Sequence, residues 1–124
     1  MEKVDFDEPR LAAAVESLAA HEVDQLSFGA IHLDPDGRVV SFNAAERRLS
    51  GYTKPAIGLE FFVDIAPCMN NPDFRGRIER ALAAGKLDIA FSHIGDFDDR
   101  TRALDVRIQS AAGGGCWIFL RRES

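Results

Sequence analysis

The segment from residue 28 to residue 51 constrains the fold most, because it predicts two paired strands that run directly into a short capped helix. The runs FGAIHL and RVVSF are strand-like, and the DPDG sequence between them has Pro and Gly where a tight turn takes them. Asn43 follows the second run at once and is a plausible N-cap for a helix over NAAERRLS, which Gly51 ends. A helix that starts where a strand stops is expected to pack against the sheet containing that strand.

Two further segments have helical patterns. Residues 8–20 (EPRLAAAVESLAA) are rich in Ala and Leu and predict a helix that caps another part of the molecule, since an isolated helix of this length is marginal. Residues 73–84 predict an amphipathic helix whose apolar residues, Leu82 among them, recur every four positions. Asp73 is a candidate cap for this helix, and Gly85 is a candidate stop.

The C-terminal third of the chain predicts strands. They cover residues 87–93, 102–108 and 116–120, and a glycine turn at 113–115 precedes the last one. Residues 53–60 read as a short helical or turn segment. The order of elements predicts an α+β fold with a five-stranded antiparallel sheet, helices on one face and an N-terminal helical cap.

Length and charge limit the classes of protein that this chain can represent. Its 124 residues fit a single domain, 1–124, and its net charge of −5 is spread along the chain, unlike a nucleic-acid footprint. No apolar run approaches the length of a membrane span, and residues 1–10 have no signal-peptide core, so we expect a cytoplasmic protein. Cys68 and Cys116 form no CxxC pair and have no His at metal spacing, so we expect neither a disulfide framework nor a metal site.

The segment GAIHLDPDGRVVSFNAAERRLSGYTKPAIG resembles the signature of PAS domains. Residues 61–68, FFVDIAPC, resemble the chromophore-attachment segment of the photoactive yellow proteins, and MEKVDF, DQLSFGAI and CWIFLRR are also similar to that family. The resemblance covers nearly the whole chain. It implies a PAS fold with an N-terminal cap at 1–26 and a core at 27–124.

The resemblance also implies a cofactor, p-coumaric acid, held as a 4-hydroxycinnamoyl thioester on Cys68. An accessible thiol beside a cavity would be needed, and the alternative is a buried cysteine packed as a small apolar residue. Cys116, in a predicted strand beside Trp117, is expected to be plain core. The chromophore pocket implied by the resemblance consists of Phe42, Glu46, Ser50, Tyr52, Phe61, Phe62, Ala66, Pro67 and Gly95.

Glu46 stands where the family has a glutamic acid that burial keeps neutral, so that it can donate its proton to the chromophore. Ser50 stands where the family has Thr, and its hydroxyl can support this network. The alternative for Glu46 is a solvated helix residue beside Arg47 and Arg48.

Four positions depart from the family pattern. Phe42 replaces a Tyr that donates to the chromophore, Tyr52 replaces an Arg gate, Gly95 replaces a Phe, and Asp99 replaces a Met that speeds recovery. Losing a hydrogen bond to a charged group costs about 1.5–3 kcal/mol, which raises the phenol pKa by roughly one to two units. We therefore expect absorption at shorter wavelength and slower recovery from the light-adapted state.

The sequence thus predicts a blue-light photoreceptor rather than an enzyme. Isomerisation and proton transfer would loosen the N-terminal cap and signal to a downstream protein of unknown identity. No nucleic-acid or membrane partner is expected, and a homodimer is compatible with this interpretation. The alternative is a non-photoactive PAS module that binds a small ligand or dimerises in signal transduction or transcription regulation; the changes at Phe42, Tyr52, Gly95 and Asp99 favour it.

Overall fold

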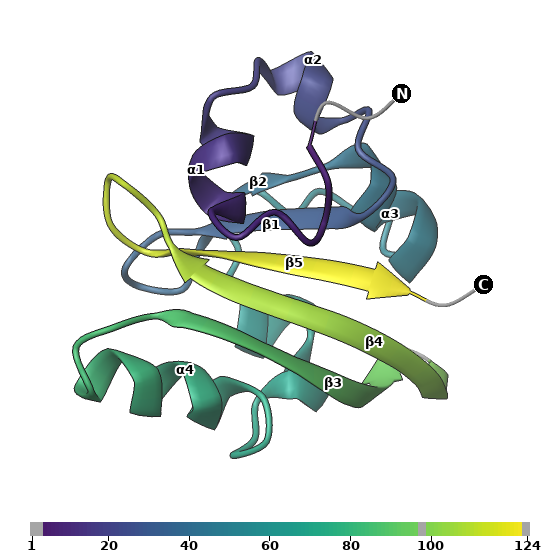
Figure 1. Cartoon of the computed structure of the whole chain (residues 1–124). Helices are drawn as coiled ribbons and strands as arrows, with labels where there is room; N and C mark the ends of the chain where they lie inside the picture. The colour runs from purple at the N-terminus through teal and green to yellow at the C-terminus, as the bar shows by residue number, and fades with distance from the viewer. Residues whose placement is uncertain (1–3, 97–98, 123–124) are drawn as a thin grey trace.

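The computed structural model describes residues 4–96 and 99–122, with the backbone alone at 95, 96 and 99–101. Five antiparallel strands form one sheet with the spatial order β2-β1-β5-β4-β3 (Figure 1). The strands are β1 (Gly29–Leu33), β2 (Val39–Phe42), β3 (Asp88–Asp96), β4 (Asp99–Ser110) and β5 (Cys116–Arg122). This arrangement confirms the predicted five-stranded fold. β3, β4 and β5 are longer than predicted, because charged residues at their ends continue the pairing, as in the match of Leu104 with Arg122.

The predicted helix over residues 8–20 is shorter in the structure, and a second short helix that was not predicted follows it. α1 (Leu11–Glu16) ends at Ser17, whose hydroxyl donates to the carbonyl of Ala14, and α2 (Ala20–Val23) begins after an extended Ala19. Competition of a serine hydroxyl for backbone groups is a known reason for a helix to stop. Both helices belong to a cap that packs through a separate apolar cluster onto one face of the sheet. That cluster comprises Val4, Phe6, Leu11, Ala12, Val15, Leu26, Phe28, Ala30, Ala111, Trp117 and Phe119.

Two side chains of β4 fasten this cap. The guanidinium of Arg107 donates to the carbonyl oxygens of Phe6, Glu8 and Pro9 at 2.6–3.2 Å. The amide of Gln109 donates to Pro9 and accepts from the N–H of Ala12 at 2.7 Å. The Gln109 amide also donates to the Asp88 carboxylate at 3.0 Å, and the Glu16 carboxylate of the cap accepts from the indole N–H of Trp117.

The hairpin and the helix after it form as predicted. Asp34 accepts hydrogen bonds across the turn, and Gly37 has a φ of 83°. α3 (Ala44–Ser50) begins at Asn43, whose side chain accepts from the N–H of Glu46, and ends at Gly51 in the left-handed conformation. α3 therefore lies directly beneath the sheet, on the face opposite the cap.

The segment between α3 and the next helix is irregular. Residues 53–60 form an irregular segment with a turn at Ile57 and Gly58 and no helix, so only the turn part of the prediction is right. A single π-helical turn, η1 (Phe61–Ile65), and a 3-10 turn, η2 (Pro67–Met69), follow. The sequence did not predict either, because one-turn helices of this kind have no periodicity of their own. Together they turn the FFVDIAPC segment back over the sheet.

α4 (Arg75–Ala83) is shorter than predicted, and its expected cap is wrong. The side chain of Asn71, rather than Asp73, accepts from the N–H groups of Asp73 and Phe74 just before the helix. Leu82, predicted on the buried face, is 57% exposed, whereas Ile78 and Ala81 are the residues of α4 that face the core. Gly85 follows the helix with a φ of 87°, as a stop requires.

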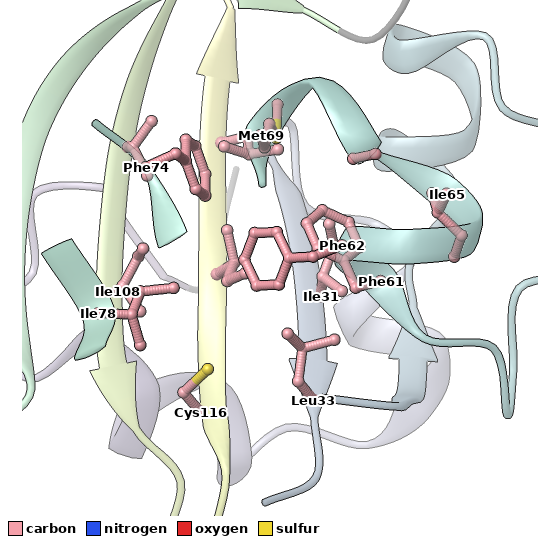
Figure 2. Close-up of a cluster of buried hydrophobic side chains, with 14 of the residues drawn as sticks. Ile31, Leu33, Phe61, Phe62, Ile65, Met69, Phe74, Ile78, Ile108 and Cys116 are labelled. Atoms are coloured by element: carbon pink, nitrogen blue, oxygen red, sulfur yellow. The ribbon is translucent and has the colours of Figure 1, made fainter. Parts of the chain in front are cut away.

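The main core lies between the sheet and the segment that contains α3, η1, η2 and α4. Figure 2 shows its aromatic centre, where Phe61, Phe62 and Phe74 meet Met69 and the strand residue Ile108. Phe61 and Phe62 contact edge to face with centroids 5.0 Å apart. Across the described residues, none of the helices has the length and apolar character needed to cross a membrane.

Candidate functional site

Cys68 lies on the surface. It sits in the middle of η2, between the exposed Pro67 and the fully buried Met69. The side-chain amide of Asn71 donates to the carbonyl of Cys68 at 2.8 Å and holds this turn. The alternative of a buried cysteine packed as core is therefore wrong for Cys68, and its thiol meets the requirement of accessibility.

A cleft of about 420 Å³ opens beside Cys68. Its lining brings together four residues of the predicted pocket that are distant in sequence, namely Cys68, Pro67, Ser50 and Tyr52. The remaining wall consists of Gly51, Thr53, Lys54, Asp64 and Ile65. The cleft is thus built from the end of α3 on one side and from the η1–η2 segment on the other.

Other residues of the predicted pocket lie deeper. Phe42, Phe61, Phe62 and Ala66 are buried members of the main core and do not line the cleft. Gly95 falls in β3 where only the backbone is described, and Asp99 begins β4 under the same limit, so the surroundings of both lie outside the described residues. The structure therefore divides the predicted pocket into an open cleft and a closed apolar interior.

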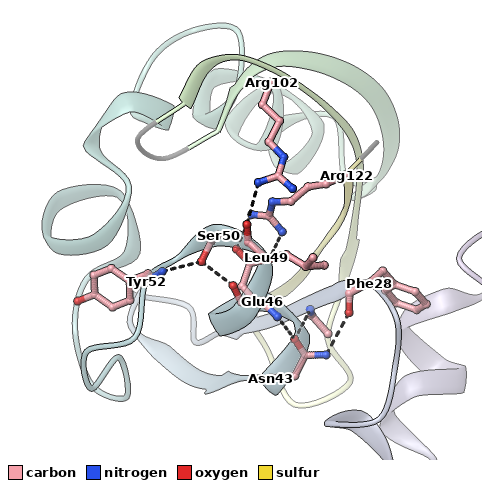
Figure 3. A network of polar contacts seen from close by, with 9 residues as sticks. Phe28, Asn43, Glu46, Leu49, Ser50, Tyr52, Arg102 and Arg122 are labelled. Carbon is pink, nitrogen blue, oxygen red and sulfur yellow. Dashed lines mark hydrogen bonds and ion pairs between the residues drawn. The ribbon is translucent and has the colours of Figure 1, made fainter. Parts of the chain in front are cut away.

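Glu46 is fully buried, so the alternative of a solvated helix residue is wrong. Its carboxylate faces the guanidinium of Arg122 in a bidentate ion pair with N–O distances of 2.7 and 2.8 Å (Figure 3). The side chain of Arg122 is only 1% exposed. The family resemblance implies a neutral acid at this position, whereas the structure gives Glu46 a cationic partner.

The backbone of β1 leaves the space that this carboxylate occupies. A Cβ atom added to Gly29 would overlap Oε1 of Glu46, so a side chain at position 29 would displace the ion pair. Arg102 of β4 fastens the same helix by donating to the carbonyl of Leu49 at 2.9 Å. α3 is thereby held to the sheet by two arginines.

Ser50 links the backbone of α3 to the cleft through hydrogen bonds to backbone groups. The hydroxyl of Ser50 donates to the backbone carbonyl of Glu46 and accepts from the N–H of Tyr52 at 3.1 Å. The ring of Tyr52 points away from the ion pair in Figure 3 and lies 5.9 Å, centroid to centroid, from that of Phe42. The expected network role of Ser50 thus takes the form of a brace at the end of α3.

Asn43 has a second role that the sequence did not reveal. Besides capping α3, its amide donates to the carbonyls of Val23 and Phe28 at 2.9 and 3.1 Å, and its oxygen accepts from Ala30. One buried side chain therefore joins the cap, β1 and α3. Asp24 adds a second link by accepting from the N–H of Ala44.

Arg122 was also missed by the sequence analysis, although strand periodicity could have found it. Ile118 and Leu120 belong to the main core, and a period of two places residue 122 on the same face. The predicted strand stopped at residue 120. The structure carries β5 two residues further.

The second cysteine is inert by comparison. Cys116 is buried in the main core, as expected, and burial raises the pKa of its thiol to about 12. A thiol with that pKa has little thiolate at neutral pH. In the described part of the chain, His, Cys, Asp and Glu side chains nowhere gather in the groups of three that could hold a metal ion.

Comparisons with known proteins agree with this architecture. A family model described as the PAS fold matches residues 23–119. Photoactive yellow protein from Rhodothalassium salexigens is 35% identical over 98% of this chain and 99% of that protein, and its namesake from Halochromatium salexigens is 33% identical over the same shares. The crystal structure of the photoactive yellow protein domain from the sensor histidine kinase Ppr of Rhodospirillum centenum superposes with a TM-score of 0.79 at 35% identity, covering 89% of this chain and 98% of that one. This chain therefore belongs to the photoactive yellow protein family and has the PAS fold.

Proposed function

We propose that this protein is a blue-light photoreceptor in which Cys68 carries p-coumaric acid as a 4-hydroxycinnamoyl thioester. The observation that carries the proposal is the exposed Cys68 thiol beside a cleft that it shares with Ser50 and Tyr52. Its membership of a family named for photoactivity supports the same conclusion.

The residues around Cys68 are suited to such a group. The cleft of about 420 Å³ lies in the range of small-molecule sites, roughly 300–1,000 Å³. Tyr52 contributes a phenol and Lys54 an ammonium to its wall, which can interact with a polar phenolic ligand. When bound, the group would supply a double bond that light isomerises.

The protein's own residues would anchor the chromophore and exchange a proton. Cys68 would fix one end through its sulfur, and Phe42, which lies in the core behind Tyr52, would be the apolar support on that side. Glu46, a fully buried acid of α3, would be the proton donor, and Ser50, which lines the cleft, donates to its backbone carbonyl. Phe61, Phe62, Ala66 and Pro67 form the support beneath the attachment turn.

The signal would be loosening of the cap, residues 1–26, which exposes a surface for a downstream signalling protein. The cap has its own apolar cluster on the sheet face opposite α3, so it can separate without opening the main core. A related domain is part of a sensor histidine kinase, which supports a role in signalling. Faster hydrogen exchange of the cap amides in light than in darkness would be the expected result.

Attachment is tested by acylation with p-coumaric anhydride. The Cys68 sulfur bonds to one carbonyl carbon, the bond from that carbon to the bridging oxygen breaks, p-coumarate leaves with the electron pair, and the thiol proton passes to solvent. We expect a mass increase of one p-coumaroyl group and a light-bleachable band in wild type and in Cys116→Ala. Both should be absent in Cys68→Ala. A folded wild-type protein that gains no adduct would overturn the proposal.

One observation favours a second candidate, a PAS interaction module without light chemistry. The interior beneath α3 is filled by aromatic side chains, and Phe42 has no hydroxyl to offer a chromophore. In that case the cleft would hold a small metabolite, or the domain would serve in dimerisation. An adduct that forms but does not respond to light would favour this candidate.

A further inference from the structure

Three aromatic side chains form a stacked row on the cap face of the sheet. The ring of Phe119 is parallel to the indole of Trp117, with 2° between the planes and 5.7 Å between the centroids. On the neighbouring strand, the imidazole of His32 continues the row 4.7 Å from Trp117, with 14° between the planes. The strand register places Ser41 of β2 opposite His32, so the next position in the row belongs to a small side chain.

A second cleft, here called the cap cleft, opens where this row ends. Its volume is about 550 Å³, within the range of small-molecule sites, and His32, Ser41 and Trp117 all line it. In the described part of the chain, the Ser41 hydroxyl is the buried side-chain polar group that has no hydrogen-bond partner. An unpaired buried hydroxyl is unfavourable, and a polar ligand atom beside it would remove that penalty.

The walls of the cap cleft come from both the cap and the sheet. Leu18 and Val23 contribute apolar side chains from the cap. Val40 of β2 and Ile57 contribute two more, and these are 48% and 60% exposed. In Figure 1, α1 and α2 lie over the β1–β2 side of the sheet, which is where these walls meet. A ligand in the cap cleft would cover exposed apolar surface on both of its sides.

The acidic residues of the cap cleft both come from the cap. Glu16 and Asp24 line it, and among the residues that the structure describes no lysine or arginine does. The carboxylate of Glu16 accepts from the indole N–H of Trp117 at 3.2 Å, and that of Asp24 accepts from the N–H of Ala44 at 2.9 Å. Carboxylates attract cations, so a positively charged aromatic ring matches both the stacked row and the charge.

We propose that the cap cleft binds a small planar aromatic cation, which stacks on His32 and holds the cap to the sheet. The ligand would touch the cap at Glu16 and the sheet at His32, so it binds the docked cap better than a loosened one. A ligand that prefers one of two states shifts the equilibrium toward that state, and leaving that state weakens its binding equally. The consequence for light sensing rests on the proposed function: the ligand would oppose loosening of residues 1–26, and light would weaken its binding.

NMR titration of the full chain without chromophore tests the site. The probe is protonated 2-aminobenzimidazole, a planar aromatic cation. Trp117 is the single tryptophan of the chain, so its indole N–H gives one signal in a proton–nitrogen spectrum. We expect saturable shifts of this signal and of the amides of residues 15–24. Absence of these shifts up to the solubility limit of the probe would overturn the inference.

Two pairs of variants locate the binding. Ser41→Leu fills the end of the row and should abolish the shifts, whereas the same exchange at the exposed Ser92 of β3 is the matched control and should bind like wild type. His32→Ala removes the stacking surface and should raise Kd roughly three- to tenfold, while His32→Phe should remain close to wild type. Equal binding by the Ala and Phe variants would refute stacking even if Ser41→Leu does not fold.

A probe of different shape separates stacking from charge. Cyclohexylammonium has a positive charge without a planar ring, and we expect it to bind more weakly than 2-aminobenzimidazole. Equal affinity for the two probes would refute recognition by the aromatic row.

These titrations need no chromophore, so they distinguish this inference from the proposed function. Failure of acylation at Cys68 would remove the light-sensing function and leave binding in the cap cleft intact. In acylated protein under light, the probe should slow hydrogen exchange of the cap amides in wild type but not in Ser41→Leu. Exchange that the probe does not change in wild type would overturn the coupling to the cap.

Discussion

The two faces of the sheet are held by different chemistry. On the α3 face a buried ion pair joins Glu46 to Arg122, whereas on the cap face Arg107 and Gln109 of β4 bind backbone carbonyls. The cap face also has carboxylate contacts, but Glu16 and Asp7, which make them, are exposed. The comparison teaches that the α3 face depends on one buried ion pair, while the cap is fastened by several separate contacts.

The largest expected effect comes from removing one partner of the buried pair. Arg122→Met leaves the Glu46 charge without compensation, and breaking a buried pair in this way costs about 3–5 kcal/mol. Urea unfolding should show this loss, and the double variant Glu46→Leu/Arg122→Met should recover most of it. A single variant that loses less than about 1 kcal/mol would refute the difference between the faces.

Substitution of Asn43 tests how the cap is connected to α3. Asn43→Ala removes an N-cap and leaves the carbonyls of Val23 and Phe28 without their donor, so we expect a loss of about 2–3 kcal/mol in unfolding free energy. Asn43→Ser keeps an N-cap oxygen but cannot reach both carbonyls, so it should recover roughly half of that loss. Equal stability of the Ser and Ala variants would mean that the N-cap hydrogen bond at the start of α3 contributes little to the unfolding free energy.

Arg107→Gln should affect the cap more than the rest of the protein. It removes hydrogen bonds to the carbonyls of Phe6, Glu8 and Pro9, and we expect a loss of about 1–2 kcal/mol. Hydrogen exchange should accelerate in residues 4–26 and remain unchanged in α3 and α4. Uniform acceleration over the whole chain would show that the cap and core unfold together.

The smallest expected effect is a pH dependence at His93. Burial lowers the pKa of this imidazole below its ordinary value of 6.5, with Asp73 opposing the shift and Arg77 adding to it. The unfolded chain then binds the proton more readily, so stability is highest above pH 6.5 and falls as the pH drops through the folded pKa. His93→Phe should show a shallower loss of stability between pH 7 and pH 5 by urea unfolding; identical slopes would exclude His93 as the cause.

The fold was predictable from sequence where one local signal sufficed. The turn before Gly37, the Asn43 cap and the alternation of the strands each depend on neighbours a few residues away. The break between α1 and α2 and the turns of η1 and η2 were not predictable, since a serine hydroxyl and single-turn helices leave no periodic pattern.

The candidate site was predictable only in part. The family resemblance pointed to Cys68, Ser50 and Tyr52, and the structure brings these three to one cleft. It could not reveal Arg122 as the partner of Glu46, because 76 residues separate them and their contact depends on how far β5 extends. Long-range pairing of buried charges is a property of the folded sheet rather than of any segment.

The Glu46 side chain occupies the space next to the α-carbon of Gly29. The carboxylate of Glu46 fills the place that any β-carbon at position 29 would take, so the two residues cannot both have large side chains. Substitutions at the two positions must therefore be made together: Gly29→Ala becomes tolerable only with a shorter residue in place of Glu46. Any change that enlarges the side chain at position 46 is therefore limited by the backbone of β1 at position 29.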